Sequence, residues 1–322
     1  MRSKAGKIPV EIFIAGAMLL AMFLFSAAFD LPIIYPTSGR AAQVGIHYIF
    51  PLIGIGALGV VIAIAGDREV AMKFLLATPC YLVVLFAHFN IKLWIPHINP
   101  VNYDAFYWQT DVWAAPLVSW SVAMRQSLQW LIPFEANFYM ISFVALFYCS
   151  FLYHAIKTPG QFGKLLIAVL LLQSLGTFAY LVTPAVGPFI YEAGINPMVT
   201  AGQQEMLGFY RGSLDHGADW IAEHGGAHFT AGLAAMPSLH SAGAFLFFLF
   251  AWQHGKILVP FYSFILLFIL VTAVASRWHY VVDVPVGIAL AWVAYRLANY
   301  LTVPKDALAE GAEVTDAQAA LT

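Results

Sequence analysis

Long apolar runs recur along almost the whole chain, and they decide what it can fold into. Most of them are close to the roughly 20 apolar residues that a helix needs to cross a bilayer. Hydrophobic residues make up 61% of the 322 residues and charged residues only 10%, whereas a soluble domain is about 25% charged. We therefore predict an all-α, polytopic membrane helical bundle. Its eight predicted spans are 10–29, 44–65, 72–91, 137–156, 163–183, 239–254, 257–275 and 281–301.

The charge balance predicts both the kind of partner and the orientation in the membrane. Lys and Arg number 15 and Asp and Glu 17, so there is no polycationic surface for nucleic acid. The first apolar run is longer than the apolar region of a signal peptide, about 7–15 residues, and we expect it to remain as a span. With the N-terminus in the cytoplasm, ten of the fifteen basic residues lie on the cytoplasmic side, as the positive-inside rule requires. Both termini are then cytoplasmic.

The order of spans and polar segments predicts three regions. Trp and Tyr are frequent at 100–133, and because these residues concentrate at the headgroup level, this segment predicts one or two interfacial helices. A ninth span is the alternative. The regions are an N-terminal one at 1–136, a helical core at 137–303 with an outer loop at 185–236, and a cytoplasmic tail at 304–322.

Polar residues at the outer ends of the last spans are the candidates for catalysis. Pro237 and Ser238 precede an apolar run, and Ser238 is suited to cap a helix. His240 would then lie in the first turn, where a helix start attracts anions such as phosphate. His279 and Asp283 are four residues apart, so we expect them on one face of the last helix. A carboxylate there would fix the imidazole tautomer and leave the other ring nitrogen free to attack.

These residues carry a resemblance to a known family. Residues 237–240, Pro-Ser-Leu-His, resemble the Pro-Ser-x-His motif of the type 2 phosphatidic acid phosphatase (PAP2) superfamily, and residues 279–283 resemble its His-Tyr-x-x-Asp motif. The resemblance covers about 163–301 and implies a PAP2-like core and no cofactor. It also implies that His279 is the nucleophile that forms a phosphohistidine, Asp283 its orienting partner and His240 the proton donor to the leaving group.

The sequence departs from the family in its basic residues. At the place of the family's Lys-x6-Arg-Pro motif, residues 183–188 read Thr-Pro-Ala-Val-Gly-Pro. A Lys-x6-Asn-Pro string from Lys92 to Pro100 lies two spans earlier, and we interpret it as chance. The family's Ser-Arg pair is also displaced, because Ser276 and Arg277 stand only three and two residues before His279. The remaining outer cations near the site are Arg277 and Arg211, and we expect them, with Ser238, to contact phosphate.

The missing cations favour one substrate charge over another. A phosphomonoester is close to a dianion and needs several fixed cations away from water, whereas a phosphodiester is a monoanion. The pattern is similar to the branch containing inositol phosphorylceramide and sphingomyelin synthases. It implies a phosphotransferase or phosphodiesterase that acts on a phospholipid in the bilayer, with an alcohol or lipid acceptor. The alternative is a lipid phosphate phosphatase acting on phosphatidate or a polyprenyl phosphate carrier.

The sequence supports two other functions, transport and zinc binding, less well. A transporter could use the polar residues within spans, but the polar cluster lies at one surface. His224 and His228 could bind zinc as helix neighbours, although Gly225-Gly226 between them weakens a helix, and we expect a solvated acidic loop without metal. Cys80 and Cys149 lie inside apolar runs and are expected to be free thiols.

Overall fold

The computed structural model describes residues 8–37, 53–66, 68–132, 135–192, 194, 197–230 and 232–302. Within these ranges the chain is all-helical and has no strand, which confirms the predicted fold class. The tail at 304–322, the basic residues that precede the first span and residues 44–52 of the second predicted span lie outside the described residues.

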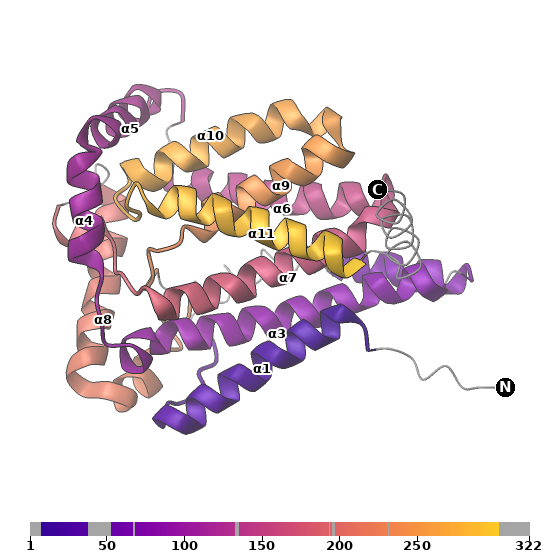
Figure 1. Cartoon of the computed structure of the whole chain (residues 1–322), viewed down its shortest axis with the longest axis horizontal. Coiled ribbons are helices and arrows are strands. Elements are labelled where there is room, and N and C mark those ends of the chain that lie inside the picture. Colours follow the sequence, from indigo (N-terminus) through magenta and orange to yellow (C-terminus); the bar gives the residue numbers. More distant parts are fainter. Residues whose placement is uncertain are drawn as a thin grey trace, which may run out of the picture.

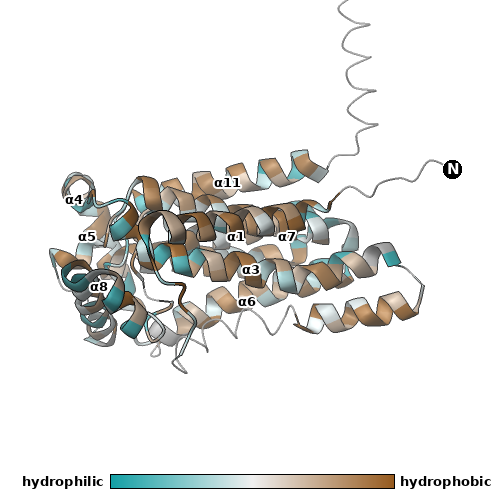
Figure 2. Cartoon of the chain, turned by 90° about the horizontal axis from the view of Figure 1, so that it is seen from below, coloured by the Kyte–Doolittle hydropathy of each residue, from teal (hydrophilic) through white to brown (hydrophobic). Residues whose placement is uncertain are grey.

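Six helical segments in the described ranges are long and apolar enough to cross a membrane, and they confirm six of the eight predicted spans. They run side by side along the bundle (Figure 1) and are mainly hydrophobic along their length (Figure 2). The chain is therefore an integral membrane protein. The six are α1 (Val10–Phe29), Ala71–Ile98 within α3 (Arg68–Ile98), Phe138–Ile156 within α6 (Glu135–Ile156), α7 (Pro159–Val182), Lys256–Ala275 comprising η2 (Lys256–Leu258) and α10 (Val259–Ala275), and α11 (Asp283–Thr302).

Two shorter apolar helices correspond to the remaining predicted spans. Ile53–Ile64 is the described part of the second one. The other is α9 (Leu239–His254), which has 16 residues. It packs against α6, α7, α10 and α11, and eight of its residues are buried. Because α9 is enclosed by longer helices, it does not need the length of a helix that faces lipid on its own.

Three further helices cross one end of the bundle: α4 (Asp104–Trp113), α5 (Ala115–Leu128) and α8 (Pro197–His224). The first two confirm the helices predicted in 100–133, and neither is long enough for a ninth span. The segment predicted as an outer loop, 185–236, is largely helical, because α8 fills much of it with 28 helical residues, kinked at Gly217. Its buried residues Met206, Leu207 and Phe209 give α8 an apolar side that packs on the core.

Chain direction brings the candidate motifs to the end of the bundle that α4 and α8 cover. Helices α3, α7 and α10 end there, and α6, α9 and α11 begin there (Figure 1). The start of α9 and the connection between α10 and α11 carry the two histidine motifs. They meet because α9 packs against both α10 and α11.

Candidate active site

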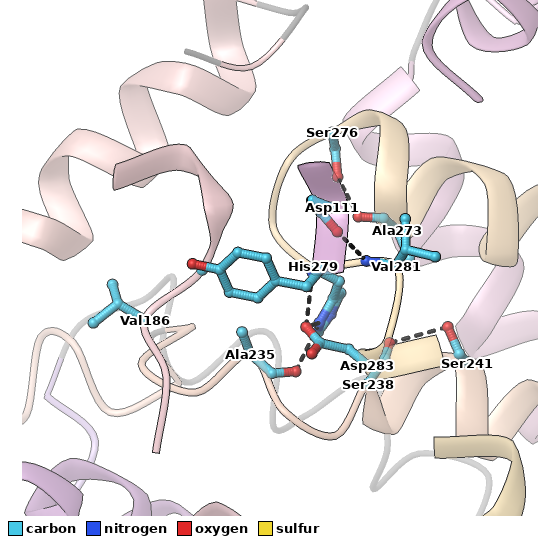
Figure 3. Close-up of polar contacts among 12 residues, drawn as sticks. Asp111, Val186, Ala235, Ser238, Ser241, Ala273, Ser276, His279, Val281 and Asp283 are labelled. Atoms are coloured by element: carbon cyan, nitrogen blue, oxygen red, sulfur yellow. Dashed lines mark hydrogen bonds and ion pairs between the residues drawn. The ribbon is translucent and has the colours of Figure 1, made fainter. Parts of the chain in front are cut away.

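His279 lies in the connection before α11, and its ring is held by two oxygen atoms. Nδ1 is 2.8 Å from the Ala235 carbonyl oxygen and 3.3 Å from Asp283 Oδ2 (Figure 3). Both oxygens accept, so Nδ1 carries the proton and Nε2 keeps its lone pair. His279 lines a cavity, and Nε2 is the ring nitrogen that neither of these two oxygens binds.

The expected placement of His279 and Asp283 on one helix face needs correction. Helix α11 begins only at Asp283, and the turn before it includes Arg277 at φ 61°. Asp283 Oδ2 accepts the Tyr280 backbone N–H at 2.8 Å. The carboxylate therefore stabilises a non-helical turn before α11. The predicted contact between Asp283 and His279 is nevertheless present.

The Pro-Ser-Leu-His motif, residues 237–240, lies at the start of α9, as its Pro-Ser pair predicts. Ser238 precedes the first helical residue, but its hydroxyl donates to Ser241 Oγ at 3.0 Å and makes no capping hydrogen bond. Its backbone N–H donates to the Asp283 carbonyl oxygen at 3.1 Å. Asp283 is therefore bonded to both motifs, through its side chain to one and its main chain to the other.

His240 and His279 face one cavity of about 380 Å³. The His240 ring makes edge contacts with Phe143 and Tyr139, with centroids 4.7 and 5.5 Å apart. These rings orient the imidazole within the first turn of α9, where free backbone N–H groups remain. The structure thus brings both predicted catalytic histidines together.

Lys92, which begins the Lys-x6-Asn-Pro string that we interpreted as chance, lines the same cavity. It is the only Lys or Arg among the described residues that line the cavity, and its ammonium group lies 5.7 Å from the centre of the Tyr180 ring. Helix α3 packs against α7, so a residue two spans earlier in the chain reaches the site. The predicted span 72–91 ended one residue before Lys92, whereas the helical segment Ala71–Ile98 includes it, so its charge lies inside an apolar span.

The two arginines expected at the phosphate lie elsewhere. Arg277 is 2% exposed, its Nη2 is 2.8 Å from Asp111 Oδ2, and its Nε is paired with Glu192. Its guanidinium also lies over the Trp108 ring at 5.7 Å. Arg211 is an exposed residue of α8. Neither is among the residues that line the cavity.

Two buried aspartates of α4 support the site and were missed in the sequence. Asp104 accepts the backbone N–H groups of Val186 and Gly187, each at 2.8 Å, and the Tyr280 hydroxyl at 2.7 Å. Burial and the Asp104 carboxylate raise the pKa of Tyr280 above its ordinary value, so this phenol stays a hydrogen-bond donor. Asp111 Oδ1 accepts the Val281 N–H at 2.8 Å (Figure 3).

The histidines of the outer segment are occupied by aromatic contacts. His224 stacks on Trp220 with centroids 3.8 Å apart, and His228 stacks on Phe209 at 4.6 Å. In the part of the chain that the structure describes, no group of three or more His, Cys, Asp and Glu residues is arranged to hold a metal ion.

The fold and the site define a class of protein: a polytopic membrane protein in which two histidines and an aspartate meet at one end of the bundle, an arrangement suited to covalent phosphoryl transfer. The sequence model of the PAP2 superfamily matches residues 112–297. Since the match covers more than half of the chain, the protein belongs to the PAP2 superfamily and is a phosphatase or phosphotransferase of lipid phosphates. Comparisons with curated proteins and with solved structures gave no match.

Proposed function

We propose that this protein transfers or cleaves the phosphorylated headgroup of a phospholipid through a phosphohistidine, in the manner of an inositol phosphorylceramide synthase. The observation that carries the proposal is the cavity shared by His240 and His279, whose described lining contains a single Lys or Arg, Lys92. In the predicted topology this end of the bundle faces the outer, non-cytoplasmic side.

In the first step, His279 Nε2 attacks phosphorus and the bond from phosphorus to the leaving oxygen breaks. His240 gives its proton to that oxygen, so the leaving group departs as a neutral alcohol. The Asp283 carboxylate, 3.3 Å from Nδ1, stabilises the positive charge that the ring gains. The products are a phosphohistidine and the first alcohol.

In the second step, a second alcohol attacks phosphorus and the bond to His279 Nε2 breaks. His240, now neutral, accepts the proton of the attacking hydroxyl. The original protonation states are restored. Attack by a lipid or headgroup alcohol gives transfer, and attack by water gives hydrolysis.

The charges around the cavity support a diester. Arg277 is neutralised by Asp111 and Glu192, so Lys92 and the backbone N–H groups of the first turn of α9 are the groups we assign to the phosphate. Ser238, expected at the phosphate, does not line the cavity, and its hydroxyl donates to Ser241. One cation matches a monoanionic diester better than a monoester dianion. The alternative, a phosphatase of phosphatidate or a polyprenyl phosphate, would use the same histidines, but it would have to bind a second negative charge.

A substrate panel with the purified protein in lipid tests this proposal. It contains phosphatidate, a polyprenyl diphosphate, phosphatidylinositol and a phosphatidyl-headgroup donor, each with and without ceramide or diacylglycerol. His279→Ala is compared with His216→Ala, an exposed α8 histidine outside the cavity lining. We expect transfer or diester cleavage that is lost only in His279→Ala. Release of inorganic phosphate from the monoesters alone would instead establish the phosphatase.

A further inference from the structure

The cavity extends well beyond the catalytic groups into the middle of the bundle. Its lining residues on α3 are Tyr81, Leu85, His88, Phe89 and Lys92. They are separated by three or four residues, apart from the adjacent pair His88 and Phe89, so they form one face of the helix. Lys92 is nearest the site end. At 1.5 Å per residue, the eleven-residue interval from Lys92 to Tyr81 corresponds to a depth of roughly 16 Å.

The opposite walls have the same gradient from polar to apolar. On α7 the lining runs from Tyr180 near the site to Val169, and on α9 from His240 to Phe247. At the deep end, the Phe147 ring packs against both Tyr81 and Phe247, with centroids 5.4 and 5.8 Å apart. The deep half of the cavity is therefore lined by apolar and aromatic groups and offers little to bind water.

A polar pair lies between the catalytic end and the apolar end. Thr177 donates its hydroxyl proton to the Gln173 carbonyl oxygen at 2.7 Å, so its oxygen must accept from His88 Nδ1, also at 2.7 Å. In a neutral imidazole the other nitrogen then accepts hydrogen bonds. His88 and Gln173 both line the cavity, and His88 lies about one helical turn deeper than Lys92 on α3.

From these features we infer that the deep cavity binds one hydrocarbon chain of the lipid substrate, and that His88 Nε2 accepts a hydrogen bond from a hydroxyl or amide N–H next to that chain. This inference rests on the proposed function and names the lipid class. A volume near 380 Å³ lies in the range of ligand pockets, about 300–1,000 Å³. The hydrocarbon chain of the lipid therefore leaves the bilayer and enters the protein, while the phosphate of the same lipid lies at His279. A lipid with a hydroxyl or amide between its phosphate and its chain matches both His88 and the apolar deep end of the cavity. A polyprenyl phosphate matches only the apolar deep end.

Filling the deep end tests the chain site. Val169→Phe adds bulk to the cavity wall, and Val182→Phe is the matched control because Val182 is 67% exposed on the same helix. We expect Val169→Phe to lower kcat/KM for a long-chain substrate by about tenfold or more, and to leave a butyl-chain substrate unaffected. Retained turnover of the short substrate shows that the variant is folded. An equal loss for both chain lengths, or no loss, overturns the chain site.

His88→Leu tests the hydrogen bond. We expect kcat/KM for a lipid with a hydroxyl or amide beside its chain to fall by about tenfold, because the donor loses its acceptor. A simple alkyl phosphodiester should be unaffected. Equal effects on both substrates would refute the role of His88.

A photoactivatable alkyl-chain lipid separates this inference from the proposed function. The chain site predicts labelling of Tyr81, Leu85 or Phe147 in the wild type and in inactive His279→Ala, and loss of labelling in Val169→Phe. Labelling confined to exposed residues such as Val182 would refute the chain site even if His279-dependent turnover is found. Cavity labelling without any turnover would refute the proposed function alone.

Discussion

Asp111 and Arg277 form a buried ion pair between α4 and the connection before α11, with 2.8 Å between Oδ2 and Nη2. The other carboxylate oxygen of Asp111 accepts the Val281 N–H. Asp111 thus binds the residues two positions before and two positions after His279. His279, the proposed nucleophile, is therefore positioned by α4, a helix that lies outside both histidine motifs.

Removing Asp111 should destabilise the fold more than it changes the chemistry. Asp111→Ala leaves the Arg277 guanidinium buried with only Glu192 as a charged partner, and breaking a buried pair in this way costs about 3 kcal/mol or more. Thermal unfolding in detergent measures the effect, and Asp215→Ala, at an exposed position of α8, is the control. Equal unfolding temperatures for the two variants would contradict the role assigned to this pair.

Asp283→Asn should lower kcat by about 10³–10⁴-fold with little change in KM. The amide cannot stabilise the charge that His279 gains on attack, while the substrate itself touches His279 rather than Asp283. Steady-state kinetics on the diester substrate measure both constants, and Asp219→Asn, at an exposed position of α8, serves as control. A change in KM at constant kcat would show that Asp283 acts on binding instead.

Lys92→Met should weaken recognition of the phosphate. A hydrogen bond to a charged group contributes about 1.5–3 kcal/mol, so kcat/KM should fall by about 10–100-fold. Lys157→Met, an exposed residue that does not line the cavity, should behave as the wild type. If Lys92→Met keeps full kcat/KM, the phosphate charge must be met by another group.

Gly287→Ala should separate α11 from the start of α9. An added Cβ would lie 2.5 Å from the Ser238 carbonyl oxygen, and because this neighbour is backbone, the helices must move. We expect a loss of about 1–3 kcal/mol in stability together with lower kcat. Gly16→Ala in α1 meets nothing within 4 Å, so it should be neutral or slightly stabilising. Similar behaviour of the two variants would refute the close approach.

Tyr280→Phe should change how stability depends on alkaline pH. Folding raises the pKa of Tyr280 above the value of an unfolded tyrosine. The native state therefore keeps a proton that an unfolded tyrosine releases at about pH 10. This stabilisation is complete below that pH and is lost as the pH rises above it. Unfolding temperatures between about pH 8 and 11 should therefore fall less steeply in Tyr280→Phe than in the wild type or in Tyr35→Phe, an exposed control. Identical slopes would contradict the assignment.

Six spans and the positions of the two histidine motifs were predictable because their signals are local. About 20 apolar residues make a span, and the Pro237-Ser238 pair marks the start of α9, which begins at Leu239. Alternation of the spans also placed His240 and His279 at one end of the bundle. Their sharing of one cavity is consistent with that expectation.

The supporting residues were not predictable because their partners are distant in the sequence. Asp104 and Tyr280 are 176 residues apart, and Lys92 reaches the cavity only because α3 packs beside α7. Arg277 seemed free to bind phosphate when read beside its sequence neighbours. Its partners Asp111 and Glu192 come from other segments, and only the folded chain shows that its charge is already balanced.

Asp283 bonds to the His279 ring through its carboxylate and to the Ser238 N–H through its main chain. One residue therefore links the segment of His279 to the segment that precedes His240, which restricts how far the two histidines can move apart. New lipid preferences would have to arise on the helix faces that line the cavity, where a substitution need not disturb the reacting atoms. In the proposed mechanism, bond cleavage and lipid selection therefore depend on different residues, so the cavity walls can change while the reacting groups stay the same.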